Sequence, residues 1–172
     1  MEKIVAEAIM KMNAFYQQTS DARRHDINHF LKVWGFAHTI GIAEGLDART
    51  QETLELAAVV HDIACPLCRE KYGSTNGRYQ EMEGKPLTRT FFEDFDLPAE
   101  QLERIVYLVG HHHSFQNVDG QDYQILLEAD FLVNADESNL EHETIKTFRD
   151  RVFQTKTGRQ LLENVYGERS AA

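Results

Sequence analysis

The residues best suited to chemistry in this sequence are the adjacent His61 and Asp62, which follow the apolar run 54–60. An imidazole and a carboxylate at the end of one helix can face the same point, and a divalent metal ion is the first candidate for what they bind. A single His-Asp pair also occurs in many unrelated proteins. The interpretation therefore depends on whether other segments supply further ligands.

Further ionisable residues lie on, or next to, the apolar faces of three other segments: His29, His112 or His113, and Asp130. A buried carboxylate without a partner costs several kcal/mol, so these groups are expected to satisfy one another. A divalent cation would do this, because it binds carboxylates as anions and imidazoles as neutral bases. Mixed nitrogen and oxygen ligation suits Mn, Fe, Co, Ni or Zn better than Ca. The alternative is a buried network of His–Asp hydrogen bonds without a metal.

The elements that must position these residues are helices, because apolar residues recur at helical spacing and nowhere alternate as in strands. We expect helices over about 3–18, 26–45, 49–63, 81–95, 97–113, 121–135, 141–152 and 157–166. This pattern predicts a single all-α domain over 1–172, built as a bundle of six to eight helices. Asp26 is expected to cap the second helix.

The stretch 64–80 is expected to be a loop beside the site, because Pro66 blocks continuation of the preceding helix. Pro86 is expected in the first turn of the next helix, which would place Glu83 at or just before its start. Cys65 and Cys68 are too few for a disulfide framework, and we interpret them as reduced thiols in this loop. A redox pair or half of a zinc site is the alternative.

The composition limits the possible partners. The chain has 172 residues and a formal net charge of -10, which argues against a nucleic-acid duplex as the main partner. It contains no apolar run near the roughly 20 residues that span a bilayer, and we expect its N-terminus to form an amphipathic helix and not a secretory signal. We therefore expect a soluble, cytoplasmic protein without a membrane partner. A small phosphorylated substrate needs only a few local cations or a metal, and is compatible with this charge.

His29, the pair His61-Asp62 and Asp130 resemble the H…HD…D signature of the HD-domain superfamily. The resemblance covers roughly residues 26–137. It implies an all-α fold and a metal site whose ligands are His29, His61, Asp62 and Asp130. Members of the superfamily are mostly metal-dependent phosphohydrolases.

The resemblance leaves the number of metal ions open. Members with a second metal take extra histidines from the region between the HD pair and the last aspartate, where this chain has His112 and His113. Glu83 stands about where some members have a further histidine. One ion with His112 outside its ligand set, and two ions with Glu83 as a ligand, are both compatible with the sequence.

The function implied is hydrolysis of a small phosphate ester, with nucleotides among the candidates, by attack of a metal-bound hydroxide. The candidate catalytic residues are Asp62, together with His112, His113 and Glu83 as acids or bases. Arg78 and Lys85, which flank the loop, are candidates for binding the substrate phosphate, although each is also readable as a solvated surface charge. The alternative function is a non-catalytic module that senses a metal or a nucleotide. The presence of all four signature residues favours the enzyme.

Overall fold

The computed structural model of this protein describes residues 2–167, and residues 1 and 168–172 of the expected domain lie outside this range. Within residues 2–167 the chain forms nine α-helices and no strand, so the prediction of an all-α fold is confirmed. The helices are α1 (Glu2–Thr19), α2 (Arg23–Ala43), α3 (Ala48–Val60), α4 (Cys65–Tyr72), α5 (Gly77–Phe91), α6 (Ala99–Val109), α7 (Gln121–Glu137), α8 (His142–Val152) and α9 (Lys156–Tyr166).

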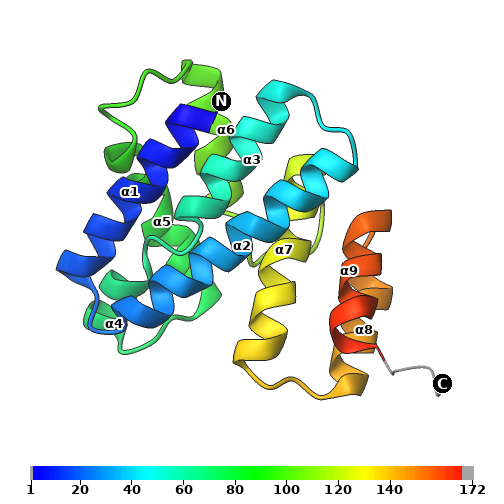
Figure 1. The fold of residues 1–172 in the computed structure, drawn as a ribbon. Coiled ribbons are helices and arrows are strands. Elements are labelled where there is room, and N and C mark those ends of the chain that lie inside the picture. The colour runs from blue at the N-terminus through cyan, green and yellow to red at the C-terminus, as the bar shows by residue number, and fades with distance from the viewer. Residues whose placement is uncertain (1, 168–172) are drawn as a thin grey trace.

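Three helices form the centre of the bundle, with α2 packed against both α3 and α7. Figure 1 shows α1 on one side of this centre and the pair α8–α9 on the other. α5 packs against α6, and the short α4 packs against α5. Each of the segments expected to carry a ligand therefore reaches the same central region.

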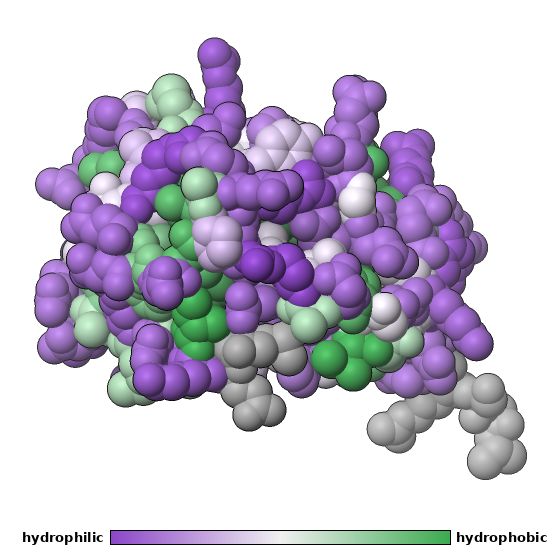
Figure 2. Space-filling view, turned by 90° about the horizontal axis from the view of Figure 1, so that it is seen from above, coloured by the Kyte–Doolittle hydropathy of each residue, from purple (hydrophilic) through white to green (hydrophobic). Residues whose placement is uncertain are grey.

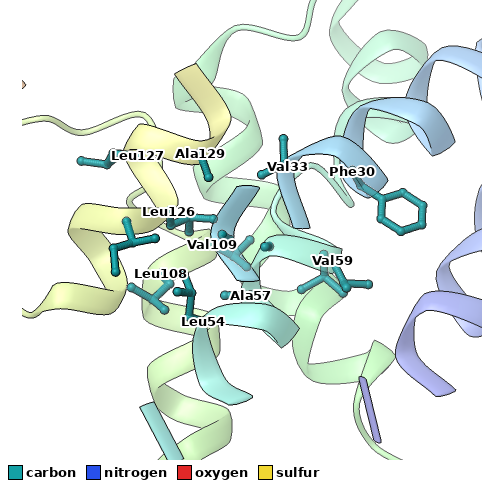
Figure 3. Close-up of a cluster of buried hydrophobic side chains, with 14 of the residues drawn as sticks. Phe30, Val33, Leu54, Ala57, Val59, Leu108, Val109, Leu126, Leu127 and Ala129 are labelled. Carbon is teal, nitrogen blue, oxygen red and sulfur yellow. The ribbon is translucent and has the colours of Figure 1, made fainter. Parts of the chain in front are cut away.

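The core lies where α2, α3, α6 and α7 meet (Figure 3). Its fully buried side chains include Phe30, Val33, Leu54, Leu108 and Leu126. In α7 every residue from 125 to 133 is buried, including the carboxylates of Glu128 and Asp130. Buried polar groups in proteins have hydrogen-bond or ionic partners, so both carboxylates must be satisfied inside the molecule.

The structure corrects the prediction for residues 64–80, which contain α4 and not only loop. Pro66 lies in the first turn of this helix instead of preventing one, because proline is tolerated in a first turn where its missing N–H has no partner. Cys65 and Cys68 are buried, unpaired thiols within α4. Burial raises the pKa of both thiols, which makes them poor nucleophiles.

The beginnings and ends of three other helices also differ from the prediction. Asn76 caps α5 by accepting a hydrogen bond from the backbone N–H of Arg78, so Pro86 lies inside that helix and Glu83 lies near its middle. α2 begins at Arg23, so Asp26 lies in its first turn and does not cap it. α6 ends at Val109, and His112 and His113 follow in a turn.

The surface is largely hydrophilic on the face that Figure 2 shows, with only small groups of hydrophobic side chains. This agrees with the formal net charge of -10. Among residues 2–167, no helix combines the length and hydrophobicity needed to cross a membrane.

Candidate metal centre

Three parts of the fold deliver the four expected ligands to one point. His29 comes from the second turn of α2, and Asp130 from the middle of α7. His61 caps the C-terminus of α3, and Asp62 follows it in the turn before α4. Because α2 packs on both α3 and α7, these side chains meet inside the bundle.

The ligand atoms of these four residues lie close together. The Nε2 atoms of His29 and His61 are 3.1 Å apart, and each lies 3.3–3.5 Å from Oδ1 of Asp130. Oδ2 of Asp62 lies 3.4 Å from Nε2 of His29 and 3.6 Å from Nε2 of His61. Ligands bonded at about 2.0–2.2 Å to one ion lie about 3.0–3.5 Å from each other. These separations fit a single bound metal ion.

The hydrogen bonds of the two imidazoles turn their lone pairs toward this point. Nδ1 of His61 donates to the backbone carbonyl of Ala58 at 2.8 Å, and Nδ1 of His29 donates to Oε2 of Glu137 at 2.8 Å. Each Nε2 is then free to bind a cation, as in metal-ligating histidines whose other nitrogen is fixed by a hydrogen bond. Without a cation or a proton between them, two such lone pairs would repel each other.

A second group of ligands lies beside the first. Nε2 of His112 is 3.4 Å from Oδ1 of Asp62, while its Nδ1 donates to the carbonyl of Val109 at 2.8 Å. Asp62, His112 and His113 each place one ligand atom within 4.8 Å of the others. Among the described residues, neither Nε2 of His112 nor that of His113 has a hydrogen-bond partner, although both atoms are buried. The carboxylate of Asp62 therefore faces both groups.

The electrostatics of the first group favour positive charge at its centre. Burial lowers the pKa of His29, but the carboxylates of Asp130, Asp62 and Glu137 outweigh this effect and raise the pKa to about 10. Burial raises the pKa of Asp62 and Asp130, yet the neighbouring histidines lower both values below the usual range. Both carboxylates are thus held ionised where a cation would bind.

His112 and His113 differ in their electrostatics despite being adjacent. Burial lowers the pKa of His112, but Asp62 outweighs it and the pKa is raised. For His113, burial and the neighbouring His112 lower the pKa to about 4. The His113 imidazole is therefore neutral near pH 7, a form that can bind a metal or accept a proton.

Solvent reaches the first group through Asp62. The side chain of Asp62 is 21% exposed, whereas that of His61 is completely buried. The backbone of Asp62 is held by a hydrogen bond, because the buried Tyr16 hydroxyl donates to its carbonyl at 2.9 Å.

Sequence reasoning missed three residues that support the ligands. Asn134 donates to Oδ1 of Asp130 at 2.8 Å, and Glu137 accepts from His29. Both were detectable in principle, because they follow Asp130 by four and seven residues and so share its face of the helix. Tyr16 carries no comparable signal, since its position resembles that of any core aromatic residue.

The remaining candidates are less closely placed. Glu83 binds Lys71 at 2.6 Å and the Tyr72 hydroxyl at 2.5 Å, and it belongs to neither group of potential ligands found in residues 2–167. Arg78 and Lys85 are exposed on α5. Arg78 follows Gly77, whose backbone packs closely on the His113 ring. A Cβ added at Gly77 would lie 2.7 Å from Cγ of His113.

Comparison with a known structure supports the observed fold. The crystal structure of a predicted HD superfamily hydrolase from an uncultured Thermotogales bacterium is similar over 94% of this chain and 84% of that one. The TM-score is 0.67 and the sequence identity is 20%, so the likeness shows the fold alone. No curated protein matches the chain.

Comparison with sequence families gives a direct assignment. The family described as HD domain matches residues 26–149, which include all four expected ligands of the first group and both histidines of the second. The match covers well over half of the sequence. The chain therefore belongs to the HD domain family.

Proposed function

We propose that this protein is a metal-dependent phosphohydrolase that acts on a small phosphate ester, with nucleotides among the candidate substrates. The observation that carries the proposal is the convergence of two imidazole nitrogens, 3.1 Å apart, with two carboxylate oxygens that each lie 3.3–3.6 Å from both nitrogens. Membership of the HD domain family and the fold of a predicted HD superfamily hydrolase support it.

His29, His61, Asp62 and Asp130 would hold the first ion. A second ion would be held by Asp62, His112 and His113, with the Asp62 carboxylate shared between the two. Nitrogen and oxygen donors of this kind suit Mn, Fe, Co, Ni or Zn. Such ions supply Lewis acidity, which activates water near neutral pH and offsets the charge of a phosphate.

The protein's own groups then have distinct roles. Asp62 is the ligand that solvent and substrate meet first, because its side chain is partly exposed. If only one ion is bound, His112 and His113 are the candidate acids or bases, since both Nε2 atoms lack hydrogen-bond partners among the described residues. The lowered pKa of His113 suits a proton acceptor, and the raised pKa of His112 suits a proton donor. Glu83 is a weaker candidate for an acid, because hydrogen bonds from Lys71 and Tyr72 lower its pKa and keep it ionised.

Substrate phosphate is proposed to bind on the side of the centre formed by the start of α5. Arg78 is the better placed of the two predicted cations, because the preceding Gly77 packs on the His113 ring. Lys85 lies about two helical turns further along α5, where its side chain covers Gly110. Its contribution is therefore expected to be smaller.

Turnover of phosphate esters tests the proposal. Purified protein with added Mn²⁺, Co²⁺ or Ni²⁺ should hydrolyse at least one compound in a panel of phosphomonoesters, phosphodiesters and nucleotides. Asp62→Ala should abolish this activity. Saturable nucleotide binding without any turnover across the panel would contradict the enzyme and support the sensor module.

A further inference from the structure

We propose that Glu137 is a positioning residue for the metal centre, which orients His29 and strengthens it as a ligand from the last turn of α7. This role rests on the proposed function, because it presupposes that His29 binds a metal. Glu137 belongs to neither group of potential ligands found in residues 2–167, and in this role it acts only through the His29 imidazole.

The carboxylate of Glu137 is held in place by α2. It accepts from Nδ1 of His29 at 2.8 Å and from Nζ of Lys32 at 2.8 Å, and Nε2 of His25 lies 3.1 Å from it. These three donors are spaced at 25, 29 and 32, so they share one face of α2. The His25 ring also stacks on the His29 ring, with centroids 5.9 Å apart.

His29 differs in this respect from His61 and His112. His61 and His112 each donate Nδ1–H to the backbone carbonyl of the residue three positions earlier, Ala58 and Val109. Their orientation is therefore fixed within their own turn of the chain. His29 has no such local partner, and its Nδ1–H points to a side chain from a different helix.

A charged acceptor also changes the chemistry of the ring. A carboxylate that receives Nδ1–H makes Nε2 a better donor to a metal than a neutral carbonyl does. Glu137 is the last residue of α7, which also carries Asp130. The same helix thus supplies one direct ligand and the carboxylate that supports another, seven residues apart.

The affinity for a metal ion alone tests this role. We expect Glu137→Gln to raise the dissociation constant for Mn²⁺ and Co²⁺ about 10–100-fold in isothermal titration calorimetry, which is the usual effect of losing such a partner. Glu137→Asp keeps the charge but is one methylene shorter, and its dissociation constant should lie between those of wild type and Glu137→Gln.

A matched control separates positioning from general destabilisation. Glu55 is a buried carboxylate on α3 that accepts from Nδ1 of His38 of α2 at 2.9 Å, away from the ligands. Glu55→Gln should leave the metal affinity within about twofold of wild type, even if the melting temperature of the metal-free protein falls.

The outcomes distinguish this role from the proposed function. If wild type binds Mn²⁺ or Co²⁺ and both Glu137 variants bind with the wild-type dissociation constant, the positioning role is wrong and the metal site stands. An equal loss of affinity in Glu55→Gln would also overturn it. If wild type binds neither ion, the positioning role and the proposed function both fail.

Discussion

The carboxylate of Asp62 has a different neighbour for each of its oxygen atoms. Oδ2 lies within 3.6 Å of the imidazoles of His29 and His61, and Oδ1 lies 3.4 Å from His112. The Tyr16 hydroxyl holds its backbone carbonyl. Asp62 therefore contacts both groups of ligands. A substitution in one group that moves the Asp62 carboxylate should also alter metal binding by the other group.

His112 and His111 provide a prediction with an adjacent control. His112→Gln should lower the turnover of a phosphate ester by about 10²–10⁴-fold, because it removes either a ligand of a second ion or a general acid or base. His111 donates to the carbonyl of Tyr107 and belongs to neither ligand group, so His111→Gln should retain most of the activity. Steady-state kinetics at saturating Mn²⁺ would measure both.

Two results would contradict the prediction for His112. Wild-type turnover in His112→Gln would show that the second group has no catalytic role. Equal losses in the two variants would show that the turn after α6 matters only as a structural unit.

At the scale of helices, a buried ion pair joins the start of α2 to α4. Arg69 of α4 donates to both carboxylate oxygens of Asp26 at 2.7–2.8 Å, and the Ser20 hydroxyl donates to the same side chain. Asp26 is buried, whereas the Arg69 side chain is 36% exposed. Because α4 follows the turn that contains Asp62, this pair anchors the segment just after the metal centre.

We expect Asp26→Ala to lower the free energy of unfolding by about 2–4 kcal/mol in urea denaturation. The range lies somewhat below that for breaking a fully buried pair, because solvent screens part of Arg69. The matched control is Glu103→Ala, which breaks the exposed pair between Arg89 and Glu103 and should leave the free energy of unfolding almost unchanged, because solvent screens both charges. Similar losses in the two variants would contradict a special role for the α2–α4 contact.

The contribution of Asp26 should also depend on pH. Burial raises its pKa, but hydrogen bonds from Arg69 and Ser20 outweigh this effect, and the pKa is lowered from 3.8. The stability difference between wild type and Asp26→Ala should therefore be fully present above pH 3.8 and shrink as the pH falls through the lower folded value. A difference that grows on acidification would contradict this assignment.

Much of the fold and site could be predicted because the relevant residues break an apolar pattern. Asp130 stands in the middle of a buried stripe, and such a position requires a partner. Glu137 was missed because a glutamate at the end of a helix looks like an ordinary surface charge. Its spacing of seven residues from Asp130 indicates the shared helix face, and the contact with His29 shows what it binds.

The errors lay in short elements and helix ends. The helix α4 is only eight residues long, too short for a periodic pattern to identify. The sequence predicted Glu83 at a helix start because Pro86 was expected in the first turn, but Asn76, ten residues before Pro86, caps that helix. The interior proline lacks one backbone donor, and the surrounding helix tolerates this loss.

At the scale of the whole molecule, the candidate metal centre lies where α2 packs against α3 and α7. His29 and Asp130 are far apart in sequence, and only the packing of α2 against α7 brings them within 3.3 Å. The hydrophobic core around Phe30, Leu54 and Leu126 therefore fixes the geometry of the centre (Figure 3). An ion bound there would join α2, α7 and the end of α3 through direct ligands.

Metal content is the most direct test of this account. Elemental analysis of protein purified without chelators, and again after incubation with Mn²⁺ and Ni²⁺ followed by desalting, should find at least one transition-metal ion per chain. His61→Ala and Asp130→Ala should each lose that ion. Absence of any metal from the intact wild-type protein under all of these conditions would contradict the central claim that His29, His61, Asp62 and Asp130 form a metal site.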